Sequence, residues 1–223
     1  MASGSRYWTN RWETSRVDVP DLFPLFDPIF YLSKYKDVKE NPVLHYLKAG
    51  APMLYNPSPL FDTEFYLRNH PDIGASTNPL VHFAQVGWMQ RRDPHPLFDV
   101  SFYLNQYIDV LEAGTNPLVH FILHGWRERR NPHPQFDTNF YLETNQDVAR
   151  SNTNPLAHFI ISGALEGRSP SPLFDSAFYL QKYQDVRDSG MNPLTHYCLF
   201  GHTEGRQTNF AETGLPACSG VNL

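Results

Sequence analysis

The segment Asn41-Pro42-Val43-Leu44-His45-Tyr46 decides the fold, because its pattern Asn-Pro-hydrophobic-x-His-aromatic occurs five times in 223 residues. The pattern returns at residues 78–83, 116–121, 154–159 and 192–197, with successive histidines 37, 38, 38 and 38 residues apart. A constant period of this length is typical of a repeat array. The period also bears on function, since an array presents the same surface several times whereas an active site needs one special set of residues.

A second motif, Phe-Asp-x-x-Phe-Tyr-Leu, precedes each Asn-Pro motif and begins at residues 26, 61, 98, 136 and 174. A glycine follows each Asn-Pro asparagine by nine residues, and the next Phe-Asp aspartate follows that glycine by twelve. A further aspartate always lies ten residues after the Phe-Asp aspartate, and all length variation falls between it and the Asn-Pro motif. The fixed intervals predict packed units, and the variable interval predicts a surface loop.

The Phe-Asp motif predicts a first helix of about eleven residues in each unit. Its aspartate is a good N-cap, because the carboxylate can accept hydrogen bonds from the free amides of the first turn. The phenylalanine before the cap and the tyrosine four residues after it have the spacing of a hydrophobic staple, as in Phe26 and Tyr31. Tyr31, Tyr35 and Val38 continue an apolar set at helical spacing.

The Asn-Pro motif predicts a second helix of about eight residues, with asparagine as N-cap and proline in the first turn. The glycine nine residues on is expected to end this helix in a left-handed conformation. Pro-rich connectors such as residues 92–97 follow, where extended or polyproline-like backbone is expected. Neither helix is long enough to be stable alone, so each repeat must bury its aromatic residues against its neighbours.

These patterns predict an all-α fold of about five tandem two-helix repeats, which form a short α-solenoid or a compact helical array. Residues 1–20, with Trp8 and Trp12, are expected to be an N-terminal cap or arm. Residues 207–223 are expected to be a C-terminal cap and tail, with Phe210 and Leu215 as cap residues. The five repeats span residues 21–206, at about 21–56, 57–93, 94–131, 132–169 and 170–206.

Composition narrows the class of protein. A hydrophobic content of 41% is enough for a buried core, and a net charge of −5 argues against a nucleic-acid partner. The sequence contains no run of eighteen apolar residues, so no transmembrane segment is predicted. The first residues also lack the apolar stretch of a signal peptide. A cytoplasmic or envelope-associated location is therefore expected. Cys198, in a helical position, is interpreted as a small buried hydrophobe, and Cys218 lies in the tail.

The five motif histidines invite a metal or catalytic interpretation. Either role needs several ligands that converge within a few ångströms. Packed helices lie roughly 10 Å apart, so histidines of stacked repeats would form a row and not a cluster. We therefore expect a structural ladder in which each histidine bonds a backbone carbonyl or an aspartate of its own repeat, with no metal and no catalytic residue. The ladder consists of His45, His82, His120, His158 and His196.

Candidate binding residues are an arginine row and two tryptophans. An arginine lies five residues after the motif glycine in repeats two to five, and it is either paired with the aspartates of its own repeat or part of a positive stripe for an anionic partner. Trp88 and Trp126 directly follow the glycines of repeats two and three. Exposed, they would offer stacking faces to sugar rings or to a protein; buried, they would be core. The arginines of the row are Arg92, Arg130, Arg168 and Arg206.

The whole unit resembles a repeat of bacterial proteins that flanks glycosyltransferase domains in polysaccharide-synthesis proteins and occurs in large secreted or surface proteins. Residues 26–206 carry the resemblance, most fully in repeats four and five with Glu166-Gly167-Arg168 and Glu204-Gly205-Arg206. Repeat one departs most, at residues 51–55. No glycosyltransferase catalytic domain fits in the remaining residues. The resemblance therefore implies a bacterial setting linked to envelope glycans and carries over no activity.

Together these observations predict a non-catalytic helical-repeat module that binds or scaffolds a protein partner or an anionic glycan, with cell-surface polysaccharide assembly as the setting that the resemblance implies. An alternative is a structural accessory subunit that packs along a larger assembly. A lesser alternative is an enzyme that uses the repeated His, Asp and Arg set. The chain lacks a phosphate-binding Gly-rich loop, Gly-x-Ser-x-Gly, His-Glu-x-x-His and Cys-x-x-Cys, so no cofactor is expected.

Overall fold

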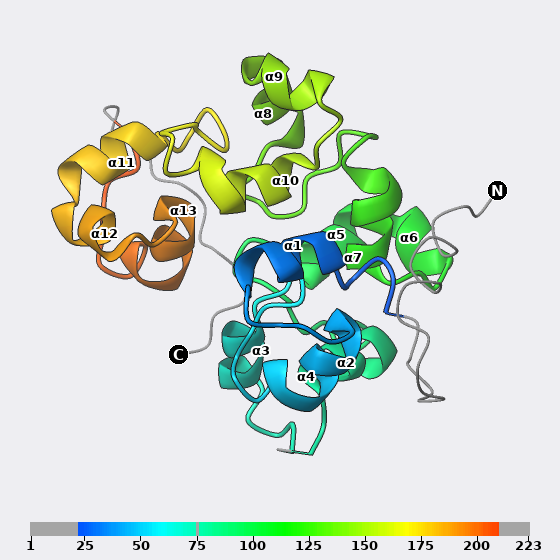
Figure 1. Ribbon diagram of the computed structural model, residues 1–223. Helices are drawn as coiled ribbons and strands as arrows, with labels where there is room; N and C mark the ends of the chain where they lie inside the picture. The colour runs from blue at the N-terminus through cyan, green and yellow to red at the C-terminus, as the bar shows by residue number, and fades with distance from the viewer. Residues whose placement is uncertain (1–21, 75, 210–223) are drawn as a thin grey trace.

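The computed structural model describes residues 22–74 and 76–209, and this part of the chain is all-helical, as the repeat pattern predicts. Short helices gather into successive clusters that follow the order of the chain, from blue through green to orange (Figure 1). The expected N-terminal cap at residues 1–20, the cap residues Phe210 and Leu215, and Cys218 lie outside the described residues. The tandem helical array is thus confirmed for the repeats themselves.

Each repeat contains one seven-residue α-helix and, after a loop or a second short helix, an α-helical turn that continues into a π-helical turn. Repeat one has α1 (Pro28–Lys34), α2 (Pro42–His45) and η1 (Tyr46–Gly50). Repeat two has α3 (Thr63–Asn69), α4 (Pro79–His82) and η2 (Phe83–Gly87). Repeat three has α5 (Val100–Gln106), α6 (Ile108–Glu112), α7 (Pro117–His120) and η3 (Phe121–Gly125). Repeat four has α8 (Thr138–Thr144), α9 (Gln146–Arg150), α10 (Pro155–His158) and η4 (Phe159–Gly163). Repeat five has α11 (Ser176–Lys182), α12 (Gln184–Ser189), α13 (Pro193–His196) and η5 (Tyr197–Gly201).

Both predicted helix caps are present in every repeat. The Phe-Asp aspartate accepts a hydrogen bond from a first-turn amide, as Asp137 does from the Phe140 amide at 2.9 Å. The motif asparagine accepts two, as Asn154 does from the amides of Leu156 and Ala157 at 3.1 Å each. The proline after it occupies the first helical position, where no amide is needed. Local sequence therefore starts both helices.

The first helix is shorter than predicted. It ends after seven residues because the next residue leaves the helical region, as Tyr107 does at φ −121° and ψ 77°. A tertiary hydrogen bond goes with the break: the Tyr107 hydroxyl accepts from the Asn131 amide of the following connector at 2.7 Å. Tyr35 and Tyr183 make the equivalent bonds to the amides of Asn56 and Gln207 at 2.8 and 2.7 Å. The same break occurs at His70 and Asn145, which make no such bond, so the expected eleven-residue helix is divided at this position in every repeat whether or not the bond is present.

The predicted role of the motif glycine is wrong. Gly163 ends a π-helical turn in ordinary helical geometry, and the left-handed residue comes four positions later, at Gly167 with φ 77°. What excludes a side chain at Gly163 is space, because a Cβ atom there would overlap the hydroxyl oxygen of Tyr141. The motif glycines of the other four repeats face the equivalent tyrosine in the same way. The glycine is thus a packing requirement of the repeat.

Neighbouring repeats are joined through their connectors. Among the described residues, no helix comes within 8 Å of a helix of another repeat, measured between Cα atoms. The backbone amide of each capping aspartate instead donates to a carbonyl of the next connector, as Asp99 does to Pro132 at 3.0 Å and Asp137 does to Pro170 at 3.0 Å. The expectation that helices of successive repeats stack about 10 Å apart is therefore wrong.

Aromatic rings fill the core of each repeat. The predicted staple is present in all five repeats, with centroids of the phenylalanine and tyrosine rings 5.1–5.5 Å apart. The same phenylalanine of repeats two to five meets the aromatic residue that begins the π-helical turn edge to face, as Phe136 meets Phe159 at 5.6 Å. Cys198 is 7% exposed, which confirms its interpretation as a buried small side chain. Burial of these aromatic rings in each repeat is the main contribution to the stability of the folded array.

Candidate functional site

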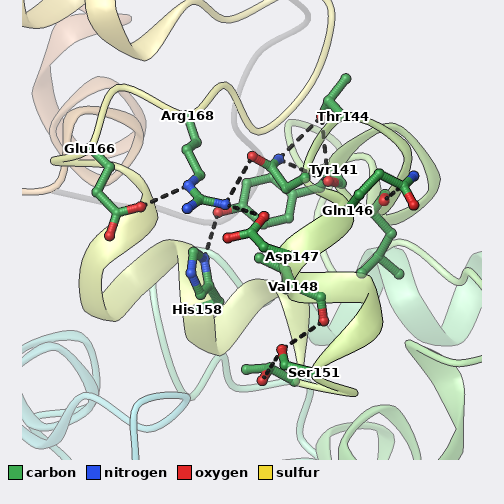
Figure 2. Close-up of polar contacts among 12 residues, drawn as sticks. Tyr141, Thr144, Gln146, Asp147, Val148, Ser151, His158, Glu166 and Arg168 are labelled. Carbon is green, nitrogen blue, oxygen red and sulfur yellow. Dashed lines mark hydrogen bonds and ion pairs between the residues drawn. The ribbon is translucent and has the colours of Figure 1, made fainter.

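Each motif histidine bonds within its own repeat, as predicted, but its partner is different. The partner is the staple tyrosine, whose hydroxyl lies 2.8–3.0 Å from the histidine Nδ1 in all five repeats. In Figure 2 the Tyr141 and His158 side chains of repeat four point toward one another. The prediction of a backbone carbonyl or an aspartate as the partner was wrong. The sequence does not show that the tyrosine hydroxyl lies between the histidine and the motif glycine.

The tyrosine–histidine pair is held in its neutral form. Burial raises the pKa of the Tyr141 hydroxyl above its ordinary value, and burial followed by the nearby Arg168 charge lowers the pKa of His158. The same directions hold for the pairs of repeats two, three and five. Within residues 22–74 and 76–209, no three His, Cys, Asp or Glu side chains lie close enough to hold a metal ion.

The arginines of repeats two to five form ion pairs inside their own repeats. Each guanidinium lies 2.6–2.8 Å from the aspartate ten residues after the capping aspartate. In repeats three to five the arginine also contacts the glutamate two residues before it, at 2.5–2.7 Å. Figure 2 shows Arg168 between Asp147 and Glu166. The bond from Arg168 lowers the pKa of Asp147 to about 2.

The exposed fractions of the paired side chains indicate that the arginines serve contacts inside their own repeats. The four arginine side chains are 16–25% exposed, whereas their aspartate partners are 60–63% exposed. The guanidinium of Arg130 also covers the Tyr107 ring at 4.9 Å. In repeat one, where Tyr55 replaces the arginine, its ring stacks on Tyr35 at 3.8 Å. The arginine row thus connects the turn after the Asn-Pro helix to the segment that follows the first helix, which in repeats three to five is the short helix α6 (Ile108–Glu112), α9 (Gln146–Arg150) or α12 (Gln184–Ser189).

The two tryptophans lie in different environments. Trp126 is 5% exposed, its indole nitrogen donates to the Ile122 carbonyl at 3.1 Å, and Arg127 lies over its ring at 4.1 Å. Trp88 is half-buried and packs against the core. Trp126 therefore has the environment of a core residue, and Trp88 keeps part of its surface open. The structure brings neither tryptophan into one site with the arginine row.

A pocket lies where repeat two meets repeat three, at a place that the sequence analysis did not single out. Its volume is about 190 Å³, and its lining combines the end of α3, the turn before Asp93 and the start of α5. The lining residues are Phe65, Asn69, His70, Arg91, Asp93, Asp99 and Ser101. Because the other repeats are so alike, the residues that open this pocket can be found by comparing equivalent positions.

His70 is the first departure from the repeat. It occupies the position of Tyr35, Tyr107 and Tyr183, whose hydroxyls each accept a connector amide. The shorter imidazole leaves its buried Nε2 atom without a hydrogen-bond partner among the described residues. Burial and the Arg92 charge lower the pKa of His70 to about 4, so the ring is neutral at pH 7.

Asp93 is the second departure. Asn56 and Asn131 at the equivalent positions accept the amides of Thr63 and Thr138, and Asp93 accepts the Val100 amide at 2.8 Å in the same way. The asparagine amide supplies this bond without a charge. Burial raises the pKa of Asp93 to about 8, and the negative charge of Asp99 acts in the same direction. The hydrogen bond from the Val100 amide acts in the opposite direction but is the smaller effect. A signal in the sequence was available, since Asp93 and His70 both differ from their equivalents in repeats one and three.

The fold and these contacts define an array of tandem helical repeats. A polar frame, made of the tyrosine–histidine bond and the arginine–aspartate ion pair, recurs in repeats two to five, and a pocket lies where repeats two and three meet. Comparison with known protein-family models, with curated proteins and with solved structures gives no match. In the described part of the chain, none of the helices is both long and apolar enough to cross a membrane.

Proposed function

We propose that this chain is a non-catalytic helical-repeat module that binds a protein partner. The observation that carries the proposal is a recurrent apolar surface at the end of the second helix and in the turn after it. This region exposes large apolar side chains in four of the five repeats. They are Met53 and Leu54, Val86 and Met89, Ile161 and Leu165, and Phe200. Repeated apolar residues at one place of successive units are typical of surfaces that repeat proteins use for binding.

The polar frame supports the non-catalytic part of the proposal. Its histidines, arginines and aspartates bond one another or the staple tyrosine in repeat after repeat, and this use is structural. Catalytic groups are instead aimed at a reacting atom. An anionic glycan is a weaker candidate partner than a protein, since the arginines are already paired. Cell-surface polysaccharide assembly as the setting rests on the resemblance of the repeat alone.

The alternative of an accessory subunit uses the same surface, with a permanent partner in place of a transient one. The distribution of the exposed residues over four repeats favours it, because a long partner could contact all four. The two versions differ in whether the isolated chain is stable as a monomer.

Site-specific photo-cross-linking tests the proposal. A photoreactive amino acid is placed at position 89 or 165, two residues after the motif glycine, and the protein is expressed in its native host. The matched control is position 64 on α3, because Glu64 is a charged residue on a solvent-exposed helix surface. Cross-links to one partner at 89 and 165 and none at 64 are expected. Equal cross-linking at all three positions, or none, would contradict a binding surface at the second helix.

A further inference from the structure

A lysine ammonium group occupies the same place in repeats one and five, at the end of the first helix. In repeat five, Lys182 ends α11, and its Nζ atom donates a hydrogen bond to the side-chain oxygen of Gln207 in the following connector. The same Nζ atom lies 5.3 Å from the centre of the Phe178 ring and 5.8 Å from that of Tyr183. In repeat one, Lys34 lies over the two equivalent rings at 5.5 and 5.6 Å. Both repeats thus use aromatic rings to hold an ammonium group.

Repeat two has the pocket at this place. Its residues at the positions of Phe178, Lys182, Tyr183 and Gln207 are Phe65, Asn69, His70 and Asp93. All four line the cavity of about 190 Å³. The Asn69 side chain is shorter than a lysine and donates to the Phe65 carbonyl at 2.9 Å, within its own helix. The cavity therefore lies where a lysine of the chain places its ammonium group in repeats one and five.

Asp93 distinguishes this place from its equivalents in the other repeats. Repeats three and four also lack the lysine, but the connector residue is neutral in every repeat except the second. The equivalents of Asp93 are Asn56, Asn131, Ser169 and Gln207. A neutral asparagine makes the same bond to the next helix that Asp93 Oδ1 makes to the Val100 amide, so this bond does not require an acid.

The second oxygen of Asp93 is available to a ligand. Asp93 Oδ2 forms no hydrogen bond and no ion pair within the described part of the chain. It is also not one of the unpaired polar atoms that are fully buried there, so it keeps accessible surface, and Asp93 lines the pocket. A largely buried carboxylate is unfavourable unless a cation pairs with it. An acid at this position is therefore explained by a cation that enters the pocket.

The rest of the lining can accept such a cation. With Asp93 ionised, Asp93 and Asp99 contribute two carboxylates against the one guanidinium of Arg91, which is held by bonds to α5 at 3.0 and 3.4 Å. The side-chain carbonyl of Asn69 and the hydroxyl of Ser101 are further oxygen acceptors, and neither forms a hydrogen bond within residues 22–74 and 76–209. An ammonium group has three N–H donors for these oxygens.

We propose that the pocket between repeats two and three binds a primary alkylammonium group, in the place that the ammonium group of Lys182 takes in repeat five. The ligand nitrogen donates to Asp93 as Lys182 donates to Gln207, and its methylene groups lie against the Phe65 ring. The proposal goes beyond the protein-binding surface and does not rest on it, because none of the exposed apolar residues of that surface lines the pocket.

The probe is n-butylamine, which is the side chain of lysine as a free molecule. It is titrated into the full chain at pH 8, and the backbone amide signals are followed by NMR. The expected result is a saturable shift of the amides at residues 65–70, 93 and 99–101. The neutral 1-butanol should bind at least about tenfold more weakly, because it brings no charge to Asp93. Equal binding of the two probes, shifts confined to other repeats, or no saturation at millimolar butylamine would each overturn the proposal.

The affinity should also follow the ionisation of Asp93. Burial raises the pKa of this carboxyl to about 8 in the empty pocket, so below pH 8 it must release a proton to solvent before it can pair with the ammonium group. Binding should therefore weaken by up to about tenfold per pH unit below 8, while the amine, like a lysine with its pKa of about 10.4, stays charged. The charged groups that share the lining are Asp99 and Arg91. An affinity that does not change between pH 6 and 8 would exclude Asp93 as the partner.

Variants test the assignment to this pocket. Asp93→Asn keeps the bond to Val100 and removes the charge, so butylamine binding should fall at least about tenfold in a folded protein. Asn69→Lys restores the lysine of repeats one and five and should abolish binding by filling the pocket from within. Asp188→Asn, which removes a carboxylate that is 63% exposed on α12, is the matched control and should bind as the unmodified chain does. Binding that survives in both pocket variants would refute the proposal.

A second probe identifies the source of the ammonium group. Nα-acetyl-lysine amide carries the same group on a peptide backbone. Binding as tight as that of butylamine would assign the pocket to a lysine of a protein, whereas binding of butylamine alone would assign it to free amines. Binding of neither probe would overturn the proposal for both sources.

Discussion

The junction between repeats three and four and the junction between repeats two and three share one backbone connection and differ in their polar contacts. In both, a capping aspartate donates its amide to the following connector, from Asp62 to Pro94 at 2.9 Å and from Asp99 to Pro132 at 3.0 Å. Only at the later junction do a tyrosine and a threonine also hold the connector peptide. The connection therefore does not depend on the two hydroxyls, and the earlier junction is free to carry a pocket.

The difference between the two junctions shows that, in a repeat protein, each repeat serves as a reference for the equivalent positions of the others. A contact found in all five repeats is required by the unit, whereas a contact that some repeats lack is not. The contact of the motif glycine with the staple tyrosine belongs to the first kind. The bond from a connector amide to a tyrosine hydroxyl, absent where His70 and Asn145 occupy the position, belongs to the second. Mutations can test both assignments, and the largest effects are expected in the shared frame.

Replacing Gly163 with alanine should break the shared frame most severely. The added Cβ would overlap the Tyr141 hydroxyl, and the bond between that hydroxyl and His158 would be lost with it. Overpacking and a lost buried hydrogen bond together should lower the free energy of unfolding by about 3–5 kcal/mol. Urea denaturation measures this, with Gly74→Ala as the control because nothing lies within 4 Å of its Cβ position. Similar losses in both variants would show that space at Gly163 is not the cause.

Acid should destabilise the connectors through two buried histidines. Burial lowers the pKa of His95 and His133 to about 4, and each Nδ1 accepts a backbone amide at 3.0 or 3.1 Å, so the neutral form is the folded form. The folded pKa lies below the ordinary 6.5. Stability is therefore fully present above pH 6.5 and falls as pH decreases toward 4, by about 1.4 kcal/mol per pH unit for each histidine.

The charged groups that face His133 are Asp99 and His95, whose opposing effects are smaller than that of burial. Serine occupies the equivalent connector positions as Ser58 and Ser171. His133→Ser should therefore make the loss of stability between pH 6.5 and 4 less steep, measured by urea denaturation at each pH. An unchanged slope would mean that His133 does not titrate with unfolding.

His120→Ala tests the histidine ladder without adding an atom to the packed interior. It removes the partner of the Tyr103 hydroxyl, which lies 2.9 Å from the histidine Nδ1. The free energy of unfolding should fall by about 1–3 kcal/mol, the usual effect of leaving a buried polar group unsatisfied. Thermal or chemical denaturation gives the value. Unchanged stability combined with loss of partner binding would instead make the ladder a binding site.

Asp93→Asn should stabilise the pocket junction. Asparagine makes the equivalent bond in repeats one and three, and it carries no charge. The folded pKa of Asp93, about 8, is above the ordinary 3.8, so the unfolded chain ionises first and the carboxyl lowers stability as pH rises between these values. Above pH 7 the variant should gain about 1–3 kcal/mol, and below pH 4 the gain should vanish. A gain independent of pH would contradict an ionisable cause.

The smallest effect is expected at a left-handed turn. Arg129 has φ 62°, whereas Gly167 and Gly205 fill the same position in repeats four and five with φ 77° and 66°. Arg129→Gly should therefore raise the free energy of unfolding by up to about 1 kcal/mol, since glycine adopts this conformation without steric cost. Gly205→Ala, which has no atom within 4 Å of its Cβ position, should produce a loss of similar size. A loss of stability in Arg129→Gly, or a gain in Gly205→Ala, would show that backbone strain does not govern the turn.

The sequence by itself determined the number of repeats, their period and both helix starts. These features depend on local chemistry: a side-chain oxygen for the first amides, a proline where no amide is needed, and a phenylalanine spaced to meet its tyrosine. It also indicated that the histidines act within their repeats. The same local signals predicted Cys198 to be buried.

Only the tertiary structure decided which atoms meet across these elements. It divided the predicted first helix at Tyr107, where the hydroxyl bonds the next connector, and it gave His158 a tyrosine partner. It also joined repeats through connectors and opened the pocket at His70. Periodicity reports which residues are buried, but the partner of a buried polar atom depends on distances across the folded chain, which no local pattern contains.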